Sequence, residues 1–441
     1  MNSSRDAVDI VLRNGHILSN PDVGDVPPHG MTVIKDHTLV AVNVPWDPEI
    51  RADKVIDCTN CLIMPGIINC HTHGGMGLLR GLADDMPLDT WLRRFIFPVE
   101  QQWVKPDFVY LGCLVSMAEM VLNGITTCAD GYYFMENAAR AAIAIGMRAI
   151  VAQGILDVPT PDAHEPERCM DRAMEFIECC PRHQLIRPAL FCHSPYLCSP
   201  DTLIAAADAA RNHSLRLFCH VAETKDEVRA IRARYHASPA AHLRDVGVFG
   251  ENFVAVHCTH VNSEDMDMIA ETGAKVVHCP ESNMKLGSGA APVVQMLHRQ
   301  IGVGLGTDSA ASNNDLDMWG EMRTAALLAK LVASDPAALD AKTVVRMATM
   351  EGARVLGLSD MVGSLEPGKR ADVAVIDMTG MHLTPMYDMI SHLVYCGRGS
   401  DVRDVLIDGQ VVVRNREIQT VDQQEIKDRA RETSRNIKAG L

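Results

Sequence analysis

The sequence predicts an α/β protein whose main part is a (β/α)8 TIM barrel, with a small β-sandwich domain built from both chain ends. Eight short β-rich runs alternate with amphipathic helical stretches between residues 64 and 360, and strands that alternate with helices form parallel sheets. Polar residues follow most of these runs, at the strand ends where such barrels build their active sites. Strand-like runs with turn residues also lie near both termini, and chain ends often meet in space.

The small domain is expected to combine residues 1–63 with residues 361–420. Asn-Gly at positions 14–15 lies between apolar runs and predicts a β-hairpin, and Asp-Gly at 408–409 predicts a second one. The Pro- and Gly-rich stretch GSLEPGKRAD predicts the boundary on the C-terminal side. Residues 421–441 are expected to form a helix or tail that packs on a partner or extends freely.

The catalytic barrel is expected to span residues 64–360, with its eight strands in chain order. The runs read LIMPGIINCHTH, GITTCADGYY, MRAIVAQGIL, IRPALFCHSPY, LRLFCHVAET, NFVAVHCTHVN, AKVVHCPESN and IGVGLGTDSA. Stretches such as KPDFVYLGCLVSMAEMVLNG and SPDTLIAAADAARNH have the periodicity of amphipathic helices between them.

Composition and charge exclude several classes of function. The chain has 41 basic and 56 acidic residues and a formal net charge of −15, which argues against a surface for nucleic acid or for an anionic membrane. No apolar run reaches the roughly 18 residues of a membrane span, and the N-terminus has no signal-peptide core. The 14 scattered cysteines suit buried thiols in a reducing compartment. We therefore expect a cytoplasmic protein that acts on a small molecule.

Two histidines one residue apart, His71 and His73, end the first barrel run. Side chains at i and i+2 of a strand point to the same side, so these imidazoles converge, and two convergent imidazoles are half of a metal site. His220 ends the fifth run and Asp308 the eighth, where a buried carboxylate would be costly without a partner or a metal. His71, His73, His220 and Asp308 are therefore the predicted metal ligands. No lysine ends the fourth or fifth run to bridge a second ion, which favours one metal ion.

Three residues are predicted to be catalytic at this site. Asp308 can accept a proton from the attacking water, and Glu223 can carry a proton to the substrate. His257 can orient the attacking oxygen. Nitrogen and oxygen ligands bind several divalent ions, so Zn²⁺ is expected and Fe²⁺ or another divalent ion is an alternative. The roles of His260 and His278 stay open between structure and, for His278, support of a ligand.

Several long, ordered motifs resemble the amidohydrolase superfamily. They resemble most its 5-methylthioadenosine/S-adenosylhomocysteine deaminases, in the branch that also holds the triazine hydrolases. These motifs are PGIINCHTHGGMGLLRGLADDMPLDTWL, HSPYLCSPDTL, HVAETKDE, VHCTHV, HCPESNMKLGSGAAPV and GTDSAASNNDLDMWGEMR. The resemblance runs from about residue 8 to about residue 415. It implies one zinc ion on the four ligands above and the hydrolytic deamination of 5′-methylthioadenosine, adenosine or S-adenosylhomocysteine, with release of ammonia. Glu223 would then protonate the ring nitrogen beside the attacked carbon, and His257 would support the attacking water.

The resemblance also implies four substrate contacts. Glu100 corresponds to a carboxylate that accepts the ribose hydroxyls, and two acceptor oxygens suit a cis-diol. His193 corresponds to a histidine that contacts the purine. Ser312 corresponds to a serine that lines the base pocket, and Trp91 would wall the site.

One region departs from the family pattern. Members that act on S-adenosylhomocysteine can use arginines after the third barrel strand to bind the carboxylate of the amino-acid tail. Here Gln153 stands at one such position, and no clear second arginine appears before Arg168. A glutamine does not replace a bidentate arginine, so a neutral 5′ tail is favoured. Arg148 lies at the start of its strand, at the end of the barrel away from substrate.

Two other functions stay open. One is the removal of an amino or chloro substituent from a triazine or another heteroaromatic ring, which Glu100 disfavours because a triazine carries no diol. The other is a non-catalytic metal-binding or scaffold protein on the same barrel, since a fold alone does not give a function. The expected partners are a small-molecule nucleoside and further copies of the same chain in a homo-oligomer, with no nucleic acid and no membrane.

Overall fold

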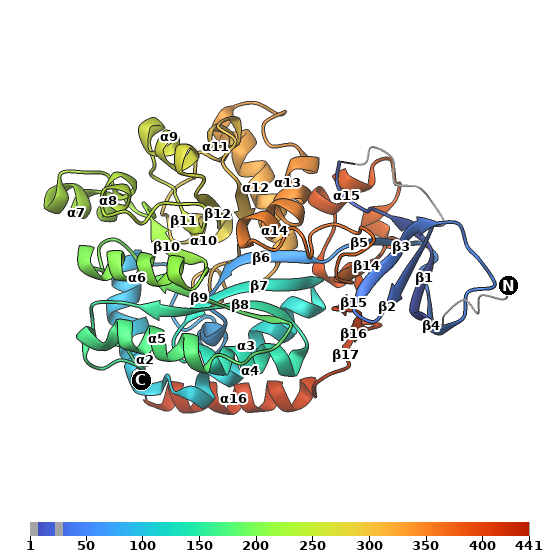
Figure 1. Cartoon of the computed structure of the whole chain (residues 1–441), viewed down its shortest axis with the longest axis horizontal. Coiled ribbons are helices and arrows are strands. Elements are labelled where there is room, and N and C mark those ends of the chain that lie inside the picture. The colour runs from blue at the N-terminus through green and yellow to red at the C-terminus, as the bar shows by residue number, and fades with distance from the viewer. Residues whose placement is uncertain (1–7, 23–29, 441) are drawn as a thin grey trace.

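The computed structural model describes residues 8–22 and 30–440, and its centre is a parallel sheet of eight strands (Figure 1). These strands are β6 (Ile67–Thr72), β7 (Ile125–Tyr132), β8 (Arg148–Ile155), β9 (Ile186–Cys192), β10 (Leu217–Val221), β11 (Phe253–His257), β12 (Lys275–His278) and β13 (Val303–Leu305). Each strand pairs in parallel with the next one in the chain. All eight predicted runs therefore supply a strand of this sheet.

Hydrogen bonds between β6 and the loop after β13 bring the two edges of the sheet together. The Thr307 amide donates to Asn69 Oδ1 at 3.1 Å, and Asn69 Nδ2 donates to Thr307 Oγ1 at 2.8 Å. One step further on, the Asp308 amide donates to the His71 carbonyl at 3.0 Å. These bonds set Asp308 beside the end of β6.

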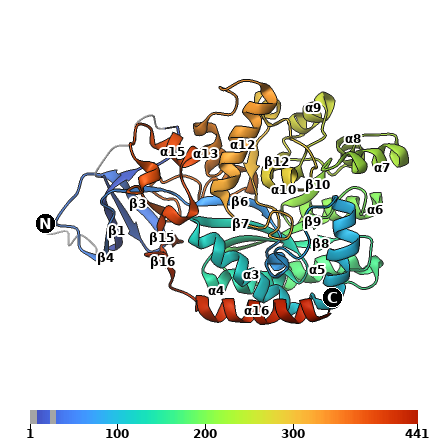
Figure 2. The same cartoon turned by 180° about the vertical axis from the view of Figure 1, so that it is seen from behind.

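Helices surround this sheet (Figures 1 and 2). Between β6 and β9 they are η1 (Gly74–Leu79), α1 (Leu88–Trp91), η2 (Leu92–Ile96), α2 (Phe97–Trp103), α3 (Pro106–Leu122), α4 (Met135–Ile145), η3 (Pro166–Arg168) and α5 (Cys169–Cys179). Between β9 and β13 they are α6 (Pro200–Asn212), α7 (Lys225–Tyr235), α8 (Pro239–Asp245), α9 (Ser263–Thr272), α10 (Pro280–Lys285) and α11 (Val293–His298). After β13 they are α12 (Met318–Ala333), α13 (Ala341–Met347) and α14 (Met350–Leu356).

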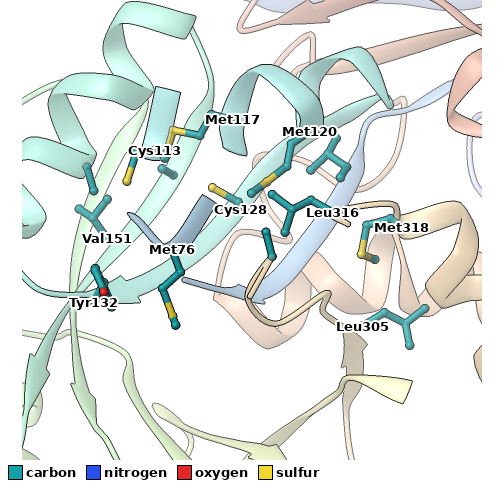
Figure 3. Close-up of a cluster of buried hydrophobic side chains, with 14 of the residues drawn as sticks. Met76, Cys113, Met117, Met120, Cys128, Tyr132, Val151, Leu305, Leu316 and Met318 are labelled. Carbon is teal, nitrogen blue, oxygen red and sulfur yellow. The ribbon is translucent and has the colours of Figure 1, made fainter. Parts of the chain in front are cut away.

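The main core lies between the barrel and its helices. Figure 3 shows a sulfur-rich part of it, where Met117 and Met120 of α3 lie near Cys128 of β7. A separate apolar cluster fills the barrel itself and includes Phe191 and Phe218, whose ring centroids are 6.4 Å apart. The barrel is therefore a packed core, and its polar side chains gather at the rim.

Strands from both chain ends form a second, mixed sheet beside the barrel (Figure 1). They are β1 (Val8–Ile17), β2 (Gly30–Lys35), β3 (Thr38–Val44), β4 (Ala52–Asp57), β5 (Cys61–Pro65), β14 (Val373–Asp377), β15 (Val402–Ile407), β16 (Gln410–Arg414) and β17 (Glu417–Ile418). The first part of β1 pairs with β2 and β4, its last residues pair with β5, and β5 pairs with β14. The two chain ends thus share one β structure, whereas the domain boundaries stay a prediction.

Two sequence predictions for this sheet are wrong. The run LIMPGIINCHTH is divided at Gly66, because β5 belongs to the mixed sheet and β6 to the barrel. A Cβ atom at Gly66 would lie 2.1 Å from Thr126 Oγ1, so this crossing needs glycine. Asn14 forms no hairpin: β1 continues through it as a bulge, with an Asn14 φ of 68°. The second hairpin, at Asp408 and Gly409, is confirmed by the antiparallel pairing of β15 and β16.

A buried ion-pair cluster joins the two sheets at the N-terminal ends of the barrel strands. Arg148 begins β8 and donates to both carboxylate oxygens of Asp372, at 2.8 and 2.9 Å. It also donates to Asp408 Oδ1 at 3.1 Å. Arg148 therefore lies at the start of its strand, as predicted, and connects the barrel to the mixed sheet.

The chain ends with η4 (Met381–Leu383), α15 (Met389–Tyr395), η5 (Gly399–Asp401) and α16 (Gln423–Gly440). The α16 helix runs along the outside of the barrel against α3 (Figures 1 and 2), and it buries Ile426 and Ile437 in the main core. The segment therefore forms the helix that was predicted, and its packing on the barrel corrects the alternative that it extends freely. Within residues 8–22 and 30–440, no helix combines the length and the apolar character that crossing a membrane requires.

Candidate active site and metal centre

The four predicted metal ligands meet at the C-terminal rim of the barrel. His71 Nε2 lies 3.3 Å from His220 Nε2 and 3.5 Å from Asp308 Oδ1. His73 Nε2 lies 3.3 Å from the same oxygen of Asp308. Two groups of side chains could therefore hold an ion: His71 with His73 and Asp308, and His71 with His220 and His257.

The spacing of these atoms fits a divalent metal. Ligands about 2.1 Å from a tetrahedral zinc ion are about 3.4 Å from one another, which agrees with the observed separations of 3.3 and 3.5 Å. The Nδ1 atom of His73 donates to the Gly131 carbonyl. Its Nε2 atom therefore keeps the lone pair that a metal binds.

Burial keeps two of the histidines neutral. It lowers the pKa of His71 to about 4 and lowers the pKa of His220 well below the usual value. A neutral imidazole is the form that binds metal.

Asp308 has two oxygens with different partners. Oδ1 faces the histidines, whereas Oδ2 accepts hydrogen bonds from Ser282 Oγ at 2.6 Å and from Ser312 Oγ at 2.9 Å. Burial alone would raise the pKa of Asp308, but the hydrogen bonds of His71 and His73, together with the charge of His73, hold it well below the usual value. The carboxylate is therefore ionised and oriented. Ser312 lines the adjacent cavity as predicted, with its hydroxyl also engaged by Asp308.

Hydrogen bonds around the N-cap of α7, Thr224, place Glu223 at the site. Thr224 Oγ1 accepts from the Glu227 amide at 3.1 Å. The Glu227 carboxylate accepts from the amides of Ala222 at 2.8 Å and Glu223 at 2.7 Å. Burial, and then the charge of Asp308, raise the pKa of Glu223 to about 8. Glu223 therefore carries a proton at neutral pH.

His257 lies next to Glu223, with 3.8 Å between His257 Nε2 and Glu223 Oε2. Its Nδ1 lies 2.9 Å from Asn283 Oδ1, which fixes a donor role for Nδ1 and leaves Nε2 as an acceptor. Burial lowers the pKa of His257, which favours this neutral form. Sequence reasoning missed Asn283, although it lies inside the motif HCPESN.

A cavity with mainly apolar and aromatic walls opens above these residues. Its lining includes Met76, Leu88, Trp91, Leu92, Ile96, Phe97, Tyr132, Tyr133, Leu156, Phe191, Tyr196 and Leu286. His73, Glu100, His193, His220, Glu223, His257, Asp308 and Ser312 supply most of its polar groups. A flat apolar ring with a few polar edge atoms suits such a site.

Glu100 is a buried carboxylate in this cavity, on α2. Tyr132, at the end of β7, donates its hydroxyl to Glu100 Oε1 at 2.7 Å. Burial raises the pKa of Glu100 to about 7. Tyr132 was missed from the sequence, although the end of the run GITTCADGYY places it at the rim.

His193 and Trp91 both border the cavity, as predicted. The His193 ring centroid lies 5.0 Å from that of His220, and burial lowers the pKa of His193 to about 3. Trp91 is 5% exposed and donates from Nε1 to the Ala83 carbonyl at 3.1 Å. It is therefore both a core residue and a wall of the cavity.

Three further polar residues that the sequence singled out do not line this cavity. Gln153 turns away from it and donates to Asp162 Oδ2 at 2.8 Å. His260 Nε2 lies 2.6 Å from the Ser288 carbonyl oxygen, and this hydrogen bond gives His260 a structural role. His278 is buried, and its Nδ1 has no hydrogen-bond partner among the described residues.

Comparison with known proteins identifies the family to which this chain belongs. The amidohydrolase family matches residues 62–412. A 5-methylthioadenosine/S-adenosylhomocysteine deaminase of Syntrophobacter fumaroxidans is 43% identical and is covered over its full length by 99% of this chain. A 5′-deoxyadenosine deaminase of Methanosarcina mazei is 38% identical, with 98% of this chain and 99% of the relative covered. The crystal structure of an adenosine deaminase from Xanthomonas campestris with bound zinc is 34% identical, covers 98% of this chain and 99% of its own, and superimposes with a TM-score of 0.95. With four potential metal ligands at the rim of its parallel barrel and these relatives along nearly its whole length, the chain belongs to the amidohydrolase family.

Proposed function

We propose that this protein is a zinc-dependent deaminase of adenine nucleosides, which converts the exocyclic amine to a carbonyl and releases ammonia. One observation carries the proposal: the buried carboxylate of Glu100 shares a cavity with the metal-type cluster, Glu223 and His257. The deaminase names of two relatives and the zinc in the related crystal structure support it. The proposal includes zinc as the native ion and a homo-oligomeric, cytoplasmic enzyme.

The side chains divide the chemistry between them. A divalent ion held by His71, His73, His220 and Asp308 would lower the pKa of water to about 7. Glu223 holds a proton below about pH 8 and donates it to the ring nitrogen beside the attacked carbon. His257 Nε2 accepts a hydrogen bond from the attacking water and orients it. Asp308, ionised by its neighbours, takes up the proton of that water. Asp308 then passes this proton to the exocyclic amine, which leaves as ammonia. The new hydroxyl group loses its proton to Glu223 as the carbonyl forms, which restores the Glu223 acid.

The cavity also explains how a nucleoside would be held. The purine lies between apolar walls, with the His193 ring next to the ligand histidines. Glu100 Oε1 receives the Tyr132 hydroxyl, and the remaining acceptor sites of the carboxylate face the ribose hydroxyls. The cost of burying this carboxylate is recovered when two hydroxyl groups donate to it.

The alternative reactions fit the site less well. A triazine would leave the buried Glu100 without donors other than Tyr132. A non-catalytic scaffold would have no need of a protonated carboxyl and an oriented imidazole beside the ligands.

The test is ammonia release from zinc-loaded protein, followed by ultraviolet absorbance. The substrates are adenosine, 5′-methylthioadenosine, S-adenosylhomocysteine, adenine, guanine and a chloro-triazine. Turnover of the nucleosides, with a strong loss of kcat/KM in Glu100→Ala, is the expected result. Turnover of only a free heterocycle, with Glu100→Ala unchanged, would overturn the nucleoside assignment.

A further inference from the structure

The Asp308 backbone has a conformation that its surroundings must enforce. Its φ angle is 59°, in the left-handed region that residues other than glycine rarely adopt. Asn314, at the far end of the same loop, has a φ angle of 76°. Such residues cost free energy and persist only where neighbouring groups fix them. The loop after β13 therefore needs contacts that hold it in this shape.

Asn313 supplies two of these contacts. Its Nδ2 group donates to the Thr307 carbonyl at 3.0 Å, and its backbone amide donates to the Ser309 carbonyl at 2.9 Å. Thr307 and Ser309 are the two neighbours of Asp308 in the chain. Asn313 therefore closes the loop around Asp308 and holds its backbone from both sides.

Glu321 supports Asn313 from the first turn of α12, where it is fully buried. Glu321 Oε1 accepts from Asn313 Nδ2 at 2.7 Å, and Glu321 Oε2 accepts from the Glu281 amide at 3.2 Å. The Nδ2 group has two hydrogens, so it can donate to Thr307 and to Glu321 together. The two oxygens of Glu321 therefore contact two different segments, the loop after β13 and the first turn of α10.

Both of these segments hold Asp308. Glu281 is followed on α10 by Ser282, whose hydroxyl donates to Asp308 Oδ2 at 2.6 Å. Asn313 holds the Asp308 backbone through the two residues beside it. The carboxyl group of Glu321 thus connects the support of the Asp308 side chain with the support of the Asp308 backbone.

The proposed reaction makes no direct use of Glu321, which does not line the catalytic cavity. Burial, and then the charge of Glu281, raise the pKa of Glu321 well above its usual value, while the hydrogen bonds from the Glu281 amide and from Asn313 oppose this shift. Burying a carboxyl group is costly unless its oxygens have donors. Each oxygen of Glu321 has one, so contacts that shape the site offset the cost of its burial.

We propose that Glu321 is a positioning residue for the metal centre: its two oxygens hold the loop after β13 and the start of α10 in the arrangement that turns Asp308 Oδ1 toward His71 and His73. The inference rests on the proposed function, because it concerns the ligands of the proposed zinc ion. It adds a residue of α12, outside the cavity, to the groups that determine zinc affinity.

Two substitutions remove the contacts of Glu321 in steps. Glu321→Gln keeps one acceptor oxygen and turns an NH2 group toward another N–H donor, whereas Glu321→Ala removes both acceptors. Zinc affinity, measured by competition with a chromophoric chelator, should fall about three- to tenfold in the first variant and about 10- to 100-fold in the second. At saturating zinc, the KM for a nucleoside substrate should stay unchanged, because Glu321 does not line the cavity.

Asn313→Asp tests the same contact from the other side. It places a second carboxyl group against Glu321 and should lower zinc affinity about as much as Glu321→Gln does. In the double variant Glu321→Gln/Asn313→Asp, an amide can again donate to a carboxylate across this contact. The zinc affinity of the double variant should therefore exceed that of Asn313→Asp alone, a recovery that a merely structural role would not produce. Asn313 is only half-buried, so this variant keeps the test open if Glu321→Ala does not fold.

Glu351→Gln is the matched control. Glu351 is also a buried glutamate in the first turn of a helix, α14, but its partner is Arg354 of the same helix and it does not line the cavity. This variant should bind zinc as tightly as the unmodified protein.

Three outcomes would overturn the role of Glu321. They are zinc affinities in the Glu321 variants equal to that of the unmodified protein, an equal loss of affinity in Glu351→Gln, and a double variant that binds zinc no better than Asn313→Asp. An unmodified protein that binds no zinc, or that turns over no nucleoside, would instead overturn the proposed function.

Discussion

The hydroxyl of Ser282 donates a 2.6 Å hydrogen bond to Asp308 Oδ2, on the side of the carboxylate that faces away from the ligand histidines. Ser312 donates to the same oxygen at 2.9 Å. The two hydroxyls fix the plane of the carboxylate and leave Oδ1 toward the histidines. Ser282 lies on α10, so this helix helps to orient the Asp308 carboxylate at the candidate metal centre.

Ser282→Ala should weaken zinc binding by about tenfold, because partners that orient a ligand typically contribute 10- to 100-fold to metal affinity. Competition with a chromophoric chelator measures this affinity. Ser364→Ala is the matched control, since Ser364 is also buried and also donates to a carboxylate, Glu366, but in a segment outside the site. Equal zinc affinities in the two variants would show that Ser282 does not support Asp308.

Glu223→Gln should lose about two to four orders of magnitude in kcat, as expected for loss of a general acid. The amide is similar in size and cannot deliver the proton that Glu223 holds below about pH 8. The zinc content, measured by inductively coupled plasma mass spectrometry, should stay at that of the unmodified protein. A variant that keeps its turnover would exclude Glu223 as the acid.

The KM for a nucleoside should rise as the pH falls from 8 to 6. The pKa of Glu100 is raised to about 7 by burial, so the carboxylate is charged above this pH and accepts hydroxyl groups less well below it. The hydrogen bond from Tyr132 lowers this pKa, so Tyr132→Phe should move the rise in KM to higher pH. Initial rates at a series of pH values measure the effect, and a 2′,3′-dideoxynucleoside is the control. If the KM values of the nucleoside and of the 2′,3′-dideoxynucleoside depend on pH equally, this role of Glu100 is excluded.

Arg148→Ala should lower the free energy of unfolding by about 3–5 kcal/mol, because it leaves the buried Asp372 without its cation and removes one of the two arginines that pair with Asp408. Urea denaturation followed by circular dichroism measures this loss. Arg211→Ala removes an exposed ion pair and should cost less than about 1 kcal/mol. A similar, small effect in both variants would mean that Asp372 and Asp408 find other partners.

The barrel and the cluster of candidate metal ligands could be predicted because their signals are local. Each barrel strand is a short apolar run that ends in a polar residue, and His71 and His73 share one face through their spacing alone. The break at Gly66 does not show in the apolar pattern, since the residues on both sides of it are equally apolar, although the pair Pro65-Gly66 is itself a turn signal. Asn14 does adopt the left-handed conformation that its turn signal indicates. The pairing of β1 with β2 and β4 nevertheless keeps the strand continuous, so the result is a bulge instead of a hairpin.

The contacts that refine the site were not predictable from spacing. Tyr132 and Glu100 are 32 residues apart, and His257 and Asn283 are 26 apart, so only the folded chain brings them together. For Gln153, the direction of the side chain could not be predicted. Its identity could be read from the sequence, but its orientation toward Asp162 depends on the loop that follows β8.

The hydrogen bonds between β6 and the loop after β13 have a consequence for synthesis on the ribosome. The candidate ligands His71 and His73 leave the ribosome more than 200 residues before Asp308, whose amide donates to the His71 carbonyl. A nascent chain that has not yet released its last barrel strand holds only an incomplete set of donors. Loading of the proposed metal ion would therefore be a late event, and the ion would not act as a nucleus for the first half of the barrel.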